Sequence, residues 1–337
     1  MEIFNDHRKL FGAAILLFVG LSIFVAIIPA LRNQKNNAPL PGSEVLSGDA
    51  LAGKYVFISE GCVACHSQQV RNVDMDKTWG SRPGIAADYA NNTRMNWWMN
   101  TATLMGTERT GPDLTDIGNR LPGADWHLLH LYNPRMVVEQ SVMPAYPWLF
   151  EWKNSPADGD KVLPLPEGNA KNQGKKLVAT KKAMQLVAYL QSLKQTPLPD
   201  GTTPPEFLYG DKSVQSSPQG GEQLLEVDGA RLYANNCQAC HQANGEGFPG
   251  AFPPLKASPI VLDDNPEILI EIIMKGYNGR EEYGEMPAVG TNNSLTAEEI
   301  TGIINHERTS WGNNARIIPQ EEVEKILEQI KIQKPVL

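Results

Sequence analysis

Cys62-Val63-Ala64-Cys65-His66 and Cys237-Gln238-Ala239-Cys240-His241 are the two stretches that decide the fold of this 337-residue chain. Together they contain all four of its cysteines. Two thiols on one helical turn can reach the two vinyl groups of a single porphyrin, and the histidine that follows then lies beneath the iron. The spacing predicts two covalently attached haem c groups, one on each cysteine pair, with His66 and His241 as axial ligands.

The other uses of paired cysteines fit the sequence less well. A redox-active pair is expected in a strand-helix-strand context, which neither half shows. A structural zinc site would require the two pairs to meet, and they are too far apart in the chain for a zinc ribbon. Pairs only two residues apart also make no disulfide framework.

A haem c iron needs a sixth ligand, and methionine is the residue type that the sequence offers. In the second half the choice is between Met274, in an apolar helical run, and Met286, which lies between Gly284 and Pro287 on a stiff loop. Met286 is the better ligand because its loop cannot fold back into a helix. Met143 is its counterpart, since it alone reproduces the Met-Pro-Ala triplet ahead of a terminal helix.

Prolines complete each predicted site. A proximal histidine usually donates its second ring N–H to a backbone carbonyl, which fixes the ring plane. We expect Pro112 and Pro253 to supply that carbonyl, although both residues also fit a simple role in turns.

The two halves repeat five features in one order: a short helix, the cysteine motif, a proline-containing turn, Met-Pro-Ala and a final helix. The helices are expected at Asp49–Glu60 and Lys181–Lys194, and again at Asp228–Asn236 and Ala297–Trp311. Thr296 and Glu299 form a capping box in the last of these. A further amphipathic segment contains Val323, Ile326, Leu327 and Ile330 at helical spacing.

Leu10 to Leu31 is free of charged residues and, at 1.5 Å per residue, is long enough to cross a bilayer about 30 Å thick. The run exceeds the apolar region of a cleaved signal peptide and lacks a good cleavage site, which favours an uncleaved anchor. Basic residues flank it equally on both sides, so charge does not set its orientation.

We therefore predict an all-α protein with a transmembrane anchor (1–35), a first cytochrome c domain (36–195), a Pro/Gly-rich linker (196–227) and a second cytochrome c domain (228–337). In each cytochrome c domain, short helices wrap round the haem. The net charge of -8 excludes nucleic acid as a ligand and suits an acidic docking face.

Two further features have competing interpretations. His127 and His130 lie at metal-binding spacing, but no third ligand accompanies them, so packed or haem-contacting histidines are favoured over a metal site. Trp97 and Trp98 fit a partner contact, the membrane interface or ordinary packing.

The first half resembles a known family. The residues that carry the resemblance are Gly61–Gln68, Thr110–Leu114, Trp126–Arg135 and Ser141–Leu149, and they look like the membrane-anchored mono-haem cytochrome c subunit of cbb3-type oxidases. Residues 229–312 resemble the class I cytochrome c domain.

The resemblance implies His66/Met143 and His241/Met286 ligation, a cytoplasmic N-terminus and periplasmic haem domains on a bacterial inner membrane. The fused second domain departs from the family pattern, as do Gln69–Asn72 and Asp74–Arg109.

The leading hypothesis is an electron-transfer subunit that passes electrons from a periplasmic donor, a cytochrome c or a quinol-oxidising complex, to a haem-copper catalytic subunit. Oxygen reduction in this chain is excluded, because a haem-copper centre needs several membrane histidines and Leu10–Leu31 contains none. The alternatives are the cytochrome c subunit of a nitric oxide reductase, and a stand-alone carrier or dehydrogenase cytochrome subunit.

Overall fold

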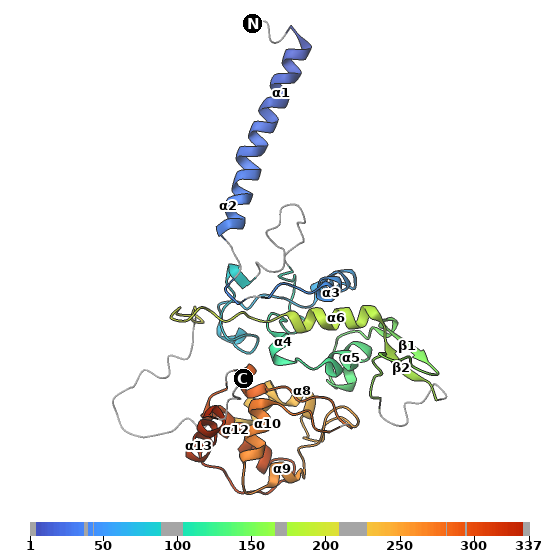
Figure 1. Cartoon of the computed structure of the whole chain (residues 1–337), viewed down its shortest axis with the longest axis vertical. Coiled ribbons are helices and arrows are strands. Elements are labelled where there is room, and N and C mark those ends of the chain that lie inside the picture. Colours follow the sequence, from blue (N-terminus) through green and yellow to red (C-terminus); the bar gives the residue numbers. More distant parts are fainter. Residues whose placement is uncertain are drawn as a thin grey trace.

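A computed structural model describes residues 5–36, 40–42, 44–88, 104–165, 174–208, 228–280, 282–293 and 295–332. Trp97 and Trp98 lie outside the described residues, as does most of the predicted linker. The chain runs from a long helix into a first domain and then into a second domain (Figure 1). The first domain lies between the long helix and the second domain.

The long helix is built from α1 (His7–Leu21), a π-helical turn η1 (Ser22–Ile27) and α2 (Ile28–Asn36). The Asp6 side chain caps its first turn by accepting from two backbone N–H groups. Pro29 has no N–H to donate and clashes with the carbonyl four residues earlier, which explains the wider turn just before it. Apolar side chains such as Leu16 and Phe18 face outward, and the helix is long and apolar enough to cross a membrane.

Two crossing helices form the frame of the first domain: α3 (Gly48–Ser59) and α6 (Lys181–Ser192). Ser47 and Thr180 cap their first turns, as serine and threonine do at helix starts. The helices meet at Gly53, where a Cβ would collide with the backbone carbonyl of Gln185. Glycine therefore permits the close approach that buries the core between them.

The rest of the first domain consists of short elements round this frame. A two-stranded antiparallel sheet pairs β1 (Phe150–Lys153) with β2 (Lys176–Ala179), an addition to the predicted all-helical domain. The short helices are η2 (Cys62–Ala64), η3 (Asp74–Asp76), α4 (Ile117–Arg120), α5 (Ala124–Tyr132), η5 (Pro134–Met136) and η6 (Pro147–Leu149).

The second domain repeats this frame with α7 (Gly229–Asn236) crossing α12 (Ala297–Thr309). Gly229 lies at the crossing, where a Cβ would collide with the carbonyl of Gly302. The Thr296/Glu299 capping box is present, as predicted. The other helices are α8 (Gln238–His241), α9 (Pro259–Leu262), α10 (Glu267–Lys275), α11 (Val289–Asn292) and α13 (Gln320–Ile332).

The last helix, α13, packs back on the second domain. Val323, Ile326 and Leu327 are buried in the same cluster as Ile300 and Ile304 of α12. The amphipathic pattern read from the sequence therefore marks a core-facing helix.

An ion-pair network orders the segment after the first cysteine motif. Asp76 is fully buried, and both Arg71 (2.9 Å) and Arg109 (2.5 Å) donate to its carboxylate. Burial alone would raise the pKa of Asp76, but these hydrogen bonds outweigh it and lower the pKa to about 2. Arg109 also donates to the Gln69 carbonyl at 2.7 Å, which ties the network to the chain just beyond His66.

Candidate haem sites

The first cysteine motif begins where α3 ends. Gly61 takes a left-handed conformation (φ 75°), which turns the chain out of the helix and into η2. Cys62 is buried in the domain core, whereas Cys65 is exposed. Met143 packs against the large core cluster of the first domain, which also contains Cys62.

His66 is held in place from one side of its ring. Its Nδ1 lies 2.8 Å from the carbonyl oxygen of Pro112. Gly111 passes so close to the ring that a Cβ there would collide with it. Burial lowers the pKa of His66, which favours the neutral imidazole that binds metals. The Pro112 carbonyl thus engages Nδ1, and Nε2 is the nitrogen left for a ligand.

Asp113 joins the segment that follows His66 to the turn that contains Pro112. Its carboxylate accepts hydrogen bonds from the Ser67 hydroxyl (2.7 Å) and from the backbone N–H groups of Gln69 and Thr115 (2.8 Å each). The turn that supplies the Pro112 carbonyl and the segment that follows His66 are therefore locked to each other.

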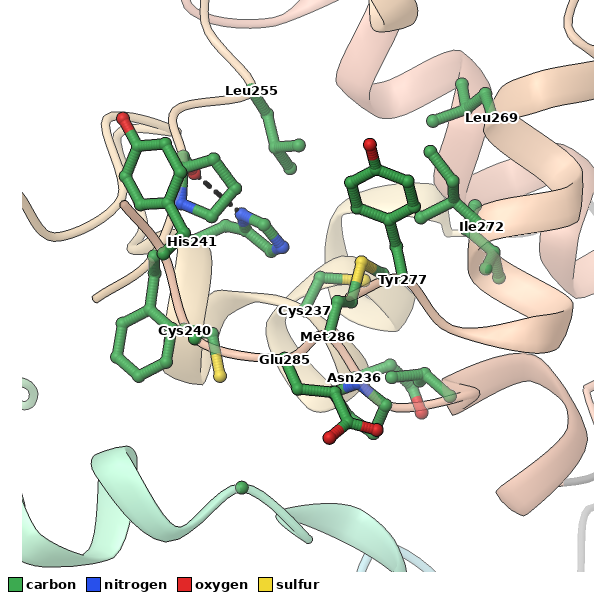
Figure 2. Close-up of a pocket in the computed structure, with 18 of the residues that line it drawn as sticks. Asn236, Cys237, Cys240, His241, Leu255, Leu269, Ile272, Tyr277, Glu285 and Met286 are labelled. Atoms are coloured by element: carbon green, nitrogen blue, oxygen red, sulfur yellow. Dashed lines mark hydrogen bonds between the residues drawn. The ribbon is translucent and has the colours of Figure 1, made fainter. Parts of the chain in front are cut away.

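The second site repeats the arrangement round an enclosed, mainly apolar cavity (Figure 2). Cys237, Cys240, His241 and Met286 all line it, whereas Met274 is not among its lining residues. Figure 2 shows the His241 ring pointing into the cavity, with Met286 reaching in from the opposite side. The fold has therefore brought together the four side chains that the sequence singled out.

His241 has the same backbone partner as its counterpart. Its Nδ1 lies 2.9 Å from the Pro253 carbonyl oxygen, and burial lowers its pKa. Met286 is held by its backbone, which exchanges two hydrogen bonds with Tyr277 (2.8 and 2.9 Å). Met274 lies in α10 and packs against the domain core, as Met286 also does, but only Met286 lines the cavity.

The buried thiols of Cys62, Cys237 and Cys240 are poorly suited to redox exchange or zinc binding. Burial raises the pKa of Cys62 and of Cys240 to about 12, and raises that of Cys237 well above its ordinary value. Thiolates are the reactive and metal-binding form, and these cysteines are protonated thiols at neutral pH. Among the described residues there is also no cluster of three metal-ligating side chains.

Two polar groups on the cavity wall were not anticipated from the sequence. Arg120 comes from the first domain, and its buried Nε finds no acceptor among the described residues. An anionic group such as a haem propionate would satisfy this donor. Burial raises the pKa of Glu307 to about 8, so this side chain is mainly uncharged at pH 7 and suits an apolar cavity. The residues present thus fit a bound haem.

His127 and His130 form no metal site. Nε2 of His127 lies 2.7 Å from the Leu121 carbonyl oxygen, and burial lowers its pKa to about 4. His130 stacks on Trp126 with ring centroids 4.6 Å apart, and burial lowers its pKa to about 3. Both are neutral packed histidines, as the sequence favoured.

Comparison with known proteins agrees with the duplicated architecture. Residues 2–162 match the family model described as "Cytochrome C oxidase, mono-heme subunit/FixO". Residues 226–306 match the model described as "Cytochrome C oxidase, cbb3-type, subunit III".

Individual relatives point in the same direction. Cytochrome c-552 of Thermus thermophilus is 38% identical over 118 residues, which are 32% of this chain and 79% of the relative. The cytochrome c subunit of a quinone alcohol dehydrogenase from Gluconacetobacter polyoxogenes is 33% identical over 135 residues, 39% of this chain and 27% of the relative. A fructose dehydrogenase cytochrome subunit from Gluconobacter japonicus is 31% identical over 124 residues, 35% of this chain and 26% of the relative. The chain thus spans about a quarter of each dehydrogenase subunit.

Proposed function

Because this chain belongs to the cytochrome c electron-transfer subunits of cbb3-type oxidases, we propose that it carries two haems c and passes electrons from a periplasmic donor to a haem-copper catalytic subunit. The observation that carries the proposal is the duplicated site. In each half, a histidine that directly follows a pair of cysteines is fixed through Nδ1 by a proline carbonyl. We also propose the domain limits 1–35, 36–195, 196–227 and 228–337.

The covalent attachment points are assigned to Cys62 and Cys65 for the first haem and to Cys237 and Cys240 for the second. Burial raises the thiol pKa of Cys62, Cys237 and Cys240, which supports bond formation with a porphyrin as the use of the two pairs. Bound haem would supply a one-electron iron couple and would require no proton from the protein.

The axial ligands are assigned as His66 with Met143 and His241 with Met286. Each histidine keeps Nε2 free because its Nδ1 is bonded to Pro112 or Pro253. A thioether opposite the histidine raises the iron potential, which suits a carrier that feeds a strong oxidant.

An exposed apolar face beside the first site is proposed as the contact with the catalytic subunit. Trp148 is 60% exposed and Val142 is 75% exposed, and both belong to the segment that carries Met143. Trp148 donates to Glu60 at the end of α3 (2.9 Å) and makes an edge contact with Tyr146. Large exposed apolar side chains held rigidly in place are typical of docking surfaces.

We place the protein in the bacterial inner membrane, with the N-terminus in the cytoplasm and both haem domains in the periplasm. The apolar helix α1–α2 and the oxidase family support the membrane anchor. The first domain follows the anchor directly and is therefore the one closest to the membrane (Figure 1).

A second candidate is a cytochrome subunit of a membrane dehydrogenase, favoured by the dehydrogenase subunits among the relatives. To decide, the full chain is purified in mild detergent and the copurifying subunits are identified. The complex is then supplied with reduced cytochrome c and tested for oxygen and nitric oxide consumption. We expect a haem-copper subunit and oxygen consumption. Nitric oxide reduction without oxygen consumption, or a copurifying flavin or quinone dehydrogenase, would overturn the proposal.

A further inference from the structure

Helix α5 of the first domain contacts the cysteine motif of the second domain. The indole N–H of Trp126 donates to the backbone carbonyl of Ala239 at 2.8 Å. Ala239 lies between the two cysteines of the second motif, and Trp126 packs in the same cluster as Cys240. The side-chain N–H of this first-domain tryptophan is therefore bonded to the second domain.

An apolar cluster surrounds this contact and is shared by the two domains. Leu129 and Val137 come from the first domain, and Phe248, Ala251 and Phe252 from the second, and all five are buried. A tryptophan anchored by a hydrogen bond beside a buried apolar cluster is the usual composition of an energetic hot spot. The two domains are thus held in one arrangement by specific contacts.

Polar residues of the first domain also approach the second site. A Cβ built on Gly284, two residues before Met286, would lie 3.1 Å from the carboxylate of Asp125, at the start of α5. Arg120 and Trp126 line the second cavity itself. The first domain therefore supplies part of the wall of the second site.

The same helix packs into the core of the first domain. His130 stacks nearly parallel to Trp126, at an interplanar angle of 11°. Leu128 and Leu131 of α5 are buried in the core cluster that contains Cys62. The packed groups of α5 therefore extend from Ala239 of the second motif into the core of the first domain.

We propose that α5 is the electron-transfer contact between the two haem sites, and that Trp126 fixes the second domain on it. The inference rests on the haem binding proposed above. The step that it serves moves one electron, which oxidises the second haem from ferrous to ferric and reduces the first from ferric to ferrous, with no bond made or broken. Trp126 acts as a positioning residue, because its hydrogen bond and packing set how the second motif faces α5.

The test uses three variants of the full chain in detergent. Trp126→Ala removes the ring and the N–H, whereas Trp126→Phe retains an aromatic ring and removes only the N–H. Tyr55→Ala is the control, since this tyrosine is half-exposed on α3 of the first domain and lies outside the proposed docking face.

Three readouts are needed. They are the covalent haem content, the distance between nitroxide labels on Asp158→Cys and Glu298→Cys, exposed positions in different domains, and the rate of electron exchange between the haems after photochemical injection. We expect one narrow distance distribution in the parent chain and in the Tyr55 variant. Trp126→Ala should broaden it, lower the docked-to-undocked ratio about thirtyfold and slow the exchange, with Trp126→Phe intermediate.

An unchanged distance distribution, or an unchanged exchange rate, in Trp126→Ala with both haems attached would refute this proposal alone. A parent chain without covalent haem would refute the proposed function, and the electron-transfer contact with it. The haem content of the parent chain therefore separates the two failures.

Discussion

Replacing Asp76 with asparagine should lower the free energy of unfolding by about the amount that the ionised carboxylate contributes through its ion pairs. The pKa of Asp76 lies at about 2 instead of its ordinary 3.8, because the hydrogen bonds from Arg71 and Arg109 outweigh the effect of burial. A tenfold change in acidity corresponds to about 1.4 kcal/mol, so the ionised carboxylate contributes about 2 kcal/mol of stability at pH 7. Asp76→Asn should lose that amount.

The sign of the pH dependence follows from the lowered pKa. The contribution of a carboxylate with a depressed pKa is complete above the pKa of the unfolded chain and disappears as the pH falls through the pKa of the folded state. About 1 kcal/mol of it should already be lost at pH 3. The difference between the parent chain and Asp76→Asn should therefore shrink from pH 7 to pH 3.

The assay is urea unfolding of the full chain in detergent at both pH values, followed by haem absorbance. Asp74→Asn is the matched control, because Asp74 is half-exposed and pairs only with Lys77 at the surface among the described residues. It should change stability by less than about 0.5 kcal/mol. Equal effects of the two variants at pH 7, or a difference for Asp76→Asn that grows as the pH falls, would refute the reasoning.

Three further predictions follow from the frame, the ligands and the docking face. Gly53→Ala and Gly229→Ala should each cost about 1–3 kcal/mol in urea unfolding, because a Cβ would force the crossing helices apart; the exposed Gly48→Ala, with open space for a Cβ, is the control. Met143→Ala and Met286→Ala should each lower the midpoint potential of one haem in a redox titration and leave the other unchanged; a shift of both haems by one substitution would contradict the assignment. Trp148→Ala should leave stability within about 0.5 kcal/mol, since the side chain is largely exposed, but should reduce copurification of the catalytic subunit; undiminished copurification would remove Trp148 from the docking face.

The sequence alone predicted the structural features that depend on a local pattern of residues. Residue types at short spacing were enough to predict three local features. These are the cysteine motifs, the capping box at Thr296 and the apolar face of α13. The different positions of Met286, on the cavity wall, and Met274, in α10, also followed locally, from a proline-stiffened loop against a helical run.

Contacts between distant segments were not predictable in the same way. Trp126 and Ala239 are over a hundred residues apart, and nothing in either segment signals the hydrogen bond that joins them. Nothing in the sequence around Arg120 indicates that this residue lines a cavity of the other domain. The four-residue strands β1 and β2 are also too short for alternation to identify them.

Oxygen consumption by complexes that lack one haem tests the central claim most directly. Serine replaces both cysteines of one motif, either Cys62 and Cys65 or Cys237 and Cys240, and copurification of the catalytic subunit is verified in each variant. Loss of the second haem should abolish oxygen consumption driven by the periplasmic donor, whereas loss of the first should abolish it with any donor that enters through this chain. Undiminished oxygen consumption without the first haem would contradict the account.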